Sequence, residues 1–242
     1  MPRYYETEAV VLRSIRLREA DRVLHLYTSE HGRVGAVAKG VRRTRSRFGG
    51  RLEPFFRLAL RLYEGKGELH TVTQAETVES YPRLRERGAS LSAATSACEA
   101  VLRLFGDGGA NTGAYNLLCR ELQLLDADAG AASTANLLAF RLKLLMAAGF
   151  LPELGTCAHC GAPATPAPRR RFSAAAGGVV CGDCATGEGF ELEPAAHSFM
   201  AATIAAPLKE APQADAGALA QVDRAVTGTL AHHAHVRLRS VA

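Results

Sequence analysis

The sequence lacks the features that mark secreted and membrane proteins. Its N-terminus has no apolar signal-peptide core, and no stretch approaches the roughly 20 consecutive apolar residues that a membrane-spanning helix requires. No repeat at the period of a solenoid is present either. With 242 residues and a hydrophobic fraction of 48%, the chain can still bury a real core. We therefore expect a cytoplasmic protein without a membrane partner.

Common catalytic signatures are absent as well. The sequence contains no G-x-x-x-x-G-K-[ST], no H-E-x-x-H and no G-x-S-x-G motif, and its Gly65-Lys66 pair is followed by Gly67 in a predicted hairpin. His232, His233 and His235 form a small cluster near the C-terminus, which we interpret as structurally neutral. Nothing points to a small-molecule substrate or to catalytic residues. We expect a protein that is not an enzyme.

Cysteine is scarce, with six residues, and four of them are paired. Cys98 and Cys119 stand alone in helical patterns, where a reduced thiol packs as a small hydrophobic group. The other four form two C-x-x-C pairs separated by twenty residues: Cys157, Cys160, Cys181 and Cys184. In a chain without a secretion signal, such pairs indicate metal or redox chemistry before disulfides.

The spacing of the paired cysteines predicts one structural zinc ion. Two residues between cysteines allow a tight knuckle that turns both sulfurs inward, and two knuckles complete a tetrahedral thiolate site. A thioredoxin-like redox site needs only one pair, and four thiolates leave no open position for a catalytic water. His159, inside the first knuckle, can replace a cysteine as ligand, but we interpret it as a solvated bystander.

Positive charge is concentrated in the first third of the chain. Residues 1–80 carry 15 Lys and Arg against 10 Asp and Glu, whereas residues 81–150 carry 7 against 6 and residues 151–242 carry 7 against 8. Residues 33–61 contain nine basic residues and a single acidic residue, Glu53. A segment with this density of positive charge attracts polyanions. It predicts that the segment binds nucleic acid, in preference to the alternative that it is only a solvated surface. A second basic run, residues 169–171, lies between the knuckles, where we expect it at a loop tip.

The same first third has the pattern of a small β domain. Five runs rich in β-branched residues, several of them alternating, predict strands at residues 8–17, 22–30, 33–41, 55–64 and 68–78. Glycines at 32, 65 and 67 are expected to supply the positive φ of two hairpin turns. Residues 40–50 read as an exposed, mobile basic loop, with Phe48 as the best candidate for an exposed ring that stacks on a base. Five antiparallel strands fit an OB-type barrel or, equally, an SH3-like barrel.

Helices follow the predicted barrel. Segments 89–105, 113–127 and 133–149 are rich in Ala and Leu at helical spacing, with Ser90 and Ser133 as expected N-caps, and helix returns after Pro194. Residues 150–193 between them read as irregular. We therefore predict an α+β multi-domain protein: an OB-fold DNA-binding domain at 1–80, an α-helical domain at 81–149 and 194–242, and a four-cysteine zinc-binding segment at 150–193.

Parts of the sequence resemble a known family. The opening EAVVLRSIRLREADRVLHLYTSEHGRV, the following AVAKGVRRTRSRFGGRLEPF, and the later LLMAAGFLPELGTCAHCG are similar to the RecO family of bacterial recombination mediators. The resemblance covers most of the chain, while the last 45 residues are matched only in helical character. It implies an OB-fold, a helical domain and a zinc-binding segment.

The resemblance also implies a function without turnover. Members of the family bind single- and double-stranded DNA, anneal complementary strands and, with the partner RecR, help to load the recombinase RecA onto strands covered by single-strand-binding protein. The family places DNA contacts in the basic segment that contains Lys39, Arg42, Arg43, Arg45, Arg47 and Arg51. To these we add Arg169, Arg170 and Arg171 as expected DNA-binding residues. We expect association with the nucleoid when the protein binds DNA.

Two other classes of function stay open at this point. The paired cysteines are compatible with a zinc-dependent or redox enzyme. The basic loop is compatible with a scaffold that recognises acidic tails, such as the tail of single-strand-binding protein.

Overall fold

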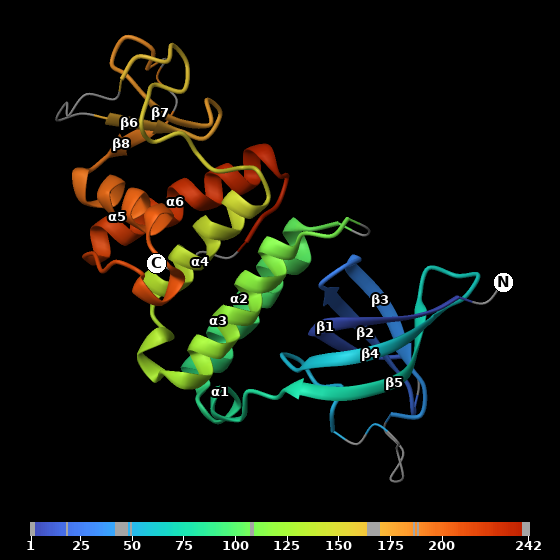
Figure 1. The fold of residues 1–242 in the computed structure, drawn as a ribbon. Helices are drawn as coiled ribbons and strands as arrows, with labels where there is room; N and C mark the ends of the chain where they lie inside the picture. The colour runs from blue at the N-terminus through green and yellow to red at the C-terminus, as the bar shows by residue number, and fades with distance from the viewer. Residues whose placement is uncertain are drawn as a thin grey trace. The chain divides into compact units, whose positions relative to one another are not determined.

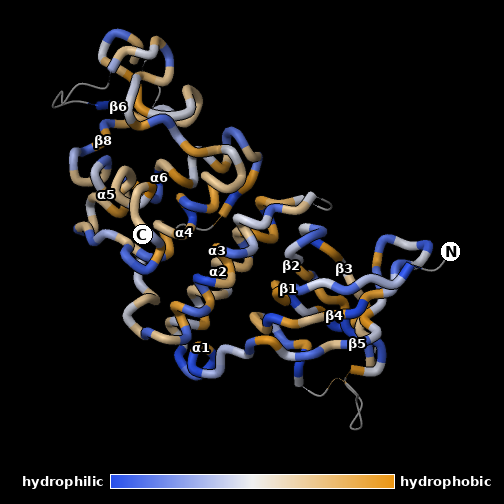
Figure 2. Tube along the Cα trace, viewed as in Figure 1, coloured by the Kyte–Doolittle hydropathy of each residue, from blue (hydrophilic) through white to orange (hydrophobic). Residues whose placement is uncertain are grey.

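The structure, a computed structural model, describes residues 3–17, 19–41, 48, 50–106, 109–163, 170–185, 187 and 189–238. Contacts divide the chain into two compact units, residues 1–130 and 131–242 (Figure 1). Among the described residues, none of the helices combines the length and apolar composition needed to cross a bilayer. Figure 2 shows that apolar residues gather along the strands and helices.

Five strands at the start of the first unit form an OB-like sheet. They are β1 (Arg3–Arg16), β2 (Arg22–Thr28), β3 (Gly32–Ala38), β4 (Arg57–Glu64) and β5 (His70–Glu79). The sheet closes on itself in the order β1-β2-β3-β5-β4, and its short β3–β5 contact is parallel and contains two residue pairs. This order is that of an OB-fold, so the predicted five strands are confirmed and the SH3-like alternative is not supported.

Strand β1 holds the sheet together because it pairs on both sides. Its first half, from Arg3 to Val10, lies against β4, while its second half pairs with β2. A bulge between Val11 and Arg13 separates the two regions and bends the strand. A 14-residue strand with one bulge can therefore close a five-stranded sheet that a straight strand would leave open.

The interior of the barrel is filled by alternate strand residues and by the segment between β3 and β4. Leu24, Leu26, Leu58 and Leu62 point inward and are fully buried. Phe48, with 2% of its surface exposed, belongs to the same core as Leu52. The prediction of an exposed, base-stacking Phe48 is therefore wrong: in a barrel this small, an aromatic ring gains more from filling the core than from solvent exposure.

The predicted positive φ of the turn glycines is confirmed for one hairpin and wrong for the other. Gly32 closes the β2–β3 hairpin with φ +65°, as expected. The β4–β5 hairpin also forms, but neither Gly65 nor Gly67 is among the glycines with positive φ. Its five-residue loop, 65–69, is long enough to turn without the left-handed backbone that a two-residue turn requires.

Three helices complete the first unit: α1 (Pro82–Glu86), α2 (Gly88–Leu104) and α3 (Thr112–Ala127). Asn111 caps α3 by accepting a hydrogen bond from the Ala114 amide. The predicted cap Ser90 instead lies within α2, which begins two residues earlier, and its side chain is buried. Helix α2 packs on the barrel, where Tyr27 contacts Phe105 at 5.4 Å between ring centroids.

The second unit contains α4 (Thr134–Ala147), α5 (Pro194–Ala205) and α6 (Ala216–His233), with short 3-10 turns at Ala129–Ala131, which spans the boundary between units, and Leu208–Glu210. Ser133 caps α4 by accepting from the Asn136 amide, as predicted, and Gly149 ends it with φ +80°. Apolar side chains from all three helices form the core. The expected helices are thus confirmed.

The segment that we expected to be irregular contains a small sheet. Strands β6 (Arg170–Ser173), β7 (Gly178–Val180) and β8 (Phe190–Leu192) pair in the order β7-β6-β8. Gly178 has no space for a side chain, because an added Cβ would collide with the backbone of Glu153. The prediction of irregular structure is wrong here because strands of three or four residues give too short a pattern to recognise.

Candidate functional site

The first C-x-x-C pair lies in a tight turn before the small sheet. The Gly161 amide donates to the Cys157 carbonyl at 2.8 Å, and Gly161 has φ +73°, a conformation that glycine adopts without strain. The Ala158 amide donates to the Val179 carbonyl at 2.8 Å, which ties this turn to β7. The first knuckle is therefore anchored directly to the strand that leads into the second.

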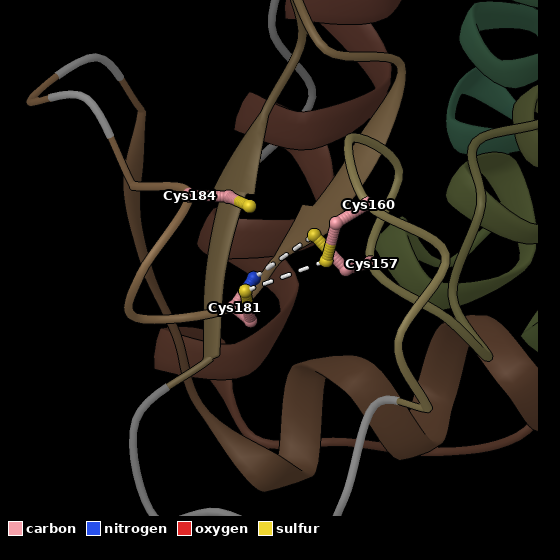
Figure 3. A group of neighbouring side chains, drawn as sticks. All are labelled: Cys157, Cys160, Cys181 and Cys184. Atoms are coloured by element: carbon pink, nitrogen blue, oxygen red, sulfur yellow. Dashed lines mark hydrogen bonds between the residues drawn. The ribbon is translucent and has the colours of Figure 1, made fainter.

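The second pair follows β7 at once. The Cys184 amide donates to the Cys181 carbonyl at 3.2 Å and closes the second turn. The Cys181 amide donates to the Cys157 sulfur at 3.3 Å and so connects the two knuckles. Figure 3 shows the four sulfurs directed toward one another.

The sulfur positions fit a tetrahedral metal site. All four sulfurs lie within 4.8 Å of one another, and the Cys160 and Cys181 sulfurs are 3.9 Å apart. A tetrahedron with metal–sulfur bonds of about 2.3 Å has edges of roughly 3.8 Å. The structure thus brings together the four cysteines selected from the sequence, in an arrangement that can hold one metal ion. Cys160 is exposed and Cys157 is buried, so the site lies at the surface.

The electrostatics of the cluster also favour a cation. Hydrogen bonds from the backbone amides of Cys160 and Cys181 lower the pKa of Cys157 to about 6. The neighbouring sulfurs of Cys181 and Cys160 raise the pKa of Cys184 to about 12. Thiolates packed this closely repel one another unless a positive ion lies between them. The backbone amides therefore stabilise the negative charge of the Cys157 thiolate, while the repulsion between neighbouring thiolates favours a bound cation.

The two remaining cysteines belong to the first unit and are not members of this cluster. Cys98 is buried in α2, and burial raises its pKa. Cys119 is partly buried in α3, and its pKa is raised mainly by the same cause. Their expected role as packed, protonated thiols agrees with this placement.

The structure describes two of the six residues expected to bind DNA in the basic segment. Lys39, just after β3, and Arg51 are both exposed. The other four, Arg42, Arg43, Arg45 and Arg47, lie outside the described residues. Lys39 and Arg51 flank these four in the sequence, and both are exposed.

The described part of the second basic run, Arg170 and Arg171, is not at a loop tip. Arg170 and Arg171 begin strand β6, and Arg169 lies outside the described residues. The Arg170 guanidinium contacts the His197 ring at 2.8 Å, and Arg171 donates to the Gly189 carbonyl at 3.1 Å. The expected loop-tip position is therefore wrong, because both side chains are partly buried and make contacts within their own unit. Their role in DNA binding stays a prediction.

The sequence favoured Phe48 as an exposed ring among the seven aromatic residues of the first 80, whereas the structure exposes Tyr4, another of the seven. Its side chain is 55% exposed, which is the largest value among the exposed hydrophobic residues of the described chain. Its ring lies 5.1 Å from that of Tyr63, and the Arg61 guanidinium is 5.3 Å from its centroid. Alternation along β1 was the available signal, but the predicted strand began only at Glu8.

Comparison with known proteins identifies a matching family over almost the whole chain. Residues 1–81 match the family described as recombination protein O, N terminal, and residues 85–242 match its C-terminal counterpart. A protein of Rubrobacter xylanophilus is 40% identical over 210 residues, which cover 86% of this chain and 83% of the relative. One of Anaeromyxobacter dehalogenans is 38% identical over 236 residues, covering 95% and 91%. Both relatives are named DNA repair protein RecO.

Proposed function

The chain belongs to the RecO family of DNA repair proteins, and we propose that it acts as a recombination mediator that binds single- and double-stranded DNA and anneals complementary strands. The observation that carries the proposal is a dense basic segment attached to an OB-like barrel. OB-folds are a common support for oligonucleotide binding. The excess charge supplies the attraction to phosphate.

We propose that the basic segment works by screening phosphate repulsion. Two complementary strands repel each other through their backbones, and each phosphate neutralised by Lys or Arg also releases counterions. Exposed Lys39 and Arg51 flank Arg42, Arg43, Arg45 and Arg47, so the charges are gathered within thirteen consecutive residues, 39–51. The barrel provides a rigid base while the strands find their register. This role needs no covalent chemistry, and we propose a non-enzymatic activity.

Partners follow from the proposed role. We propose that the chain acts with RecR to load RecA on DNA covered by single-strand-binding protein. Such loading requires contact with strands that already carry another protein, and a basic surface competes for their phosphates. Association with the nucleoid follows from the same DNA binding.

For the cysteine cluster we propose one structural zinc ion. The cluster consists of four thiol groups, and four thiolates fill a tetrahedral coordination shell without an open position for water or substrate. Segment 150–193 buries only a few apolar side chains, Phe172 the largest of them, and contains strands of only three or four residues. Metal binding would supply folding energy to this segment, which argues for a structural and against a catalytic ion.

The proposed function is tested by strand annealing. A variant with Arg42, Arg43, Arg45 and Arg47 changed to Glu should anneal complementary oligonucleotides at least about tenfold more slowly, because four attractive contacts become repulsive. The rate is measured by fluorescence quenching between labelled strands at low salt.

A charge-matched control separates an effect of the basic segment from an effect of the protein's net charge. Reversing four exposed basic residues elsewhere changes the net charge by the same amount: Arg83, Arg103, Arg120 and Lys209. This control should retain most of the annealing rate. Equal loss in both variants, or no loss in the first, would contradict a role for the basic segment.

A further inference from the structure

The four cysteines of the metal cluster differ in their access to solvent. Cys157 is buried, with 3% of its surface exposed, whereas Cys181 and Cys184 are partly buried and Cys160 is exposed. The residue after Cys160 is Gly161, which adds no side chain next to the sulfur. Oxidation of a cysteine depends on its thiolate character and on its exposure. Of the four, Cys160 is therefore the most open to a small oxidant dissolved in water.

A second sulfur lies within reach of Cys160. The sulfurs of Cys160 and Cys181 are 3.9 Å apart, well inside the 4.8 Å that bounds the cluster, and they come from different knuckles (Figure 3). A disulfide bond is about 2.0 Å long, so its formation here needs a shift of about 2 Å, shared between the two side chains. The geometry therefore offers an oxidised Cys160 a partner in the other knuckle.

Cys157 is nearer to Cys160 in the sequence, but its sulfur is held differently. It is buried, and it accepts a hydrogen bond from the Cys181 amide at 3.3 Å. A thiolate accepts such a bond strongly because it carries a negative charge, and a disulfide sulfur carries none. A bond between Cys157 and Cys160 would thus weaken the contact that connects the two knuckles. The structure favours Cys181 over Cys157 as the partner of Cys160.

We propose that Cys160 is a site of reversible oxidation, at which hydrogen peroxide produces a disulfide with Cys181. The inference rests on the structural zinc ion proposed above. The Cys160 thiolate attacks one peroxide oxygen and breaks the O–O bond, which gives a sulfenic acid and hydroxide. The Cys181 thiolate then attacks the sulfenic sulfur, forms the S–S bond and expels a second hydroxide. The two thiolates lose two electrons, and uptake of two protons turns both hydroxides into water.

The disulfide removes two of the four metal ligands. Zinc is bound by thiolates, so the remaining two cysteines should hold it too weakly to retain it. Segment 150–193 then loses the folding energy that the metal supplies. Strand β6, which begins with Arg170 and Arg171, pairs with β7, and β7 leads directly into Cys181. Oxidation should therefore loosen the small sheet that positions these arginines, while the barrel keeps its own core.

The test treats the purified, zinc-loaded full chain with hydrogen peroxide at neutral pH. Zinc release is followed with a chromogenic indicator, and the protein is digested with trypsin without reduction. Trypsin cleaves at residues 169–171, between the knuckles, so a disulfide across the knuckles joins two peptides and one within a knuckle does not. Tandem mass spectrometry identifies the cysteines that are bonded.

We expect one zinc released per chain together with a peptide pair joined through Cys160 and Cys181. Dithiothreitol with added zinc should restore the metal and remove the disulfide. Retention of zinc in peroxide, or disulfides found only within each C-x-x-C pair, would overturn the proposal.

Histidine substitutions separate reactivity from metal binding. Cys160→His keeps a ligand, since three cysteines and one histidine form common structural zinc sites, but it removes the exposed thiol. Peroxide should release zinc from this variant at least about tenfold more slowly. Cys184→His makes the same change outside the proposed pair, and it should release zinc at the rate of the unaltered protein with the same disulfide. Equal slowing in both variants would contradict the assigned pair. If either variant does not bind zinc, the disulfide of the unaltered protein decides the assignment.

The outcomes also separate this inference from the proposed function. If the purified protein contained no zinc, both the proposed metal site and the oxidation of that site would fail. If it contained one zinc that peroxide did not release, only the assignment of Cys160 would fail. The proposed annealing of DNA strands is tested on the basic segment and does not depend on either result.

Discussion

Arg141 on α4 and Asp223 on α6 form an ion pair inside the second unit, with Nη1 and Oδ1 3.6 Å apart. Their side chains are 3% and 6% exposed, so both charges are removed from water. The desolvation cost of such a pair is large, and the pair is tolerated because each charge compensates the other. The pair connects the two helices at a defined position along their contact.

The first prediction concerns this pair. Asp223→Ala should reduce the free energy of unfolding by about 3–5 kcal/mol, because it leaves the Arg141 guanidinium buried without its partner. Chemical denaturation followed by far-UV circular dichroism measures the loss. The double variant Arg141→Met with Asp223→Leu should recover most of the stability, since neither charge remains. A double variant as unstable as the single one would contradict the argument from desolvation.

The second prediction concerns metal content. The purified protein should contain one zinc per chain, and Cys157→Ser combined with Cys160→Ser should contain less than about 0.2. Cys119→Ser, at a partly buried position in α3 of the first unit, is the matched control and should keep the metal. Inductively coupled plasma mass spectrometry gives the stoichiometry.

Removal of the metal should have a local effect. Chelation should expose residues 150–193 to proteolysis while the barrel retains much of its affinity for DNA, because the barrel has its own core. Complete loss of DNA binding on chelation would show that the cluster supports more than its own segment.

The third prediction concerns thiol reactivity. Burial raises the pKa values of the Cys98 and Cys119 thiols, and the thiolate is the reactive form. At pH 8, a disulfide reagent should therefore modify these two cysteines slowly. Addition of a chelator should loosen segment 150–193, separate the cluster sulfurs and so release four fast-reacting thiols. More than four fast thiols after chelation would mean that the helices carrying Cys98 and Cys119 have opened.

The fourth prediction concerns alkaline stability. Burial raises the pKa of Tyr27 to about 12, and burial together with the Glu64 charge raises the pKa of Tyr5 to about 12. In the unfolded chain both lose a proton near pH 10, so the folded state binds more protons between pH 10 and 12. The free energy of unfolding should therefore fall as the pH rises through this interval.

A single substitution isolates the Tyr27 contribution. The Tyr27 hydroxyl is buried and has no hydrogen-bond partner within the described part of the chain. Tyr27→Phe should therefore be neutral or slightly stabilising at pH 7, and it should reduce the loss of stability above pH 10. Urea denaturation at pH 7, 10 and 11 gives both results. A large loss at pH 7 would reveal a hydrogen bond that the fold needs.

Local patterns predicted much of the fold. Alternation in the first 80 residues predicted five strands, helical spacing predicted the main helices, and the fixed spacing of the cysteines predicted the cluster. Each of these signals lies within one continuous stretch of the sequence. The strand order, in contrast, depends on which strands meet in space, and the parallel β3–β5 contact that identifies the OB-type arrangement is not visible in any single segment.

The failures also have physical causes. Phe48 lies in a polar, basic segment, so the local composition suggested exposure, yet the barrel interior requires a large ring. Arg141 interrupts an apolar helix face, and the residue that explains its burial, Asp223, lies in a different helix far along the chain. Tyr4 precedes Glu8, where the predicted strand began, so the alternation along β1 was not applied to it. For Phe48 and Arg141 the deciding neighbours are distant in sequence.

The most direct test of the account is the affinity for single-stranded DNA across a salt series. Each phosphate contact contributes a slope of about −0.7 to the dependence of log affinity on log salt concentration. We predict a steep negative slope for the unaltered protein, and a slope shallower by roughly 3 for the variant with Arg42, Arg43, Arg45 and Arg47 changed to Glu. Undetectable binding at low salt, or the same slope in both proteins, would contradict the claim that the basic segment binds DNA.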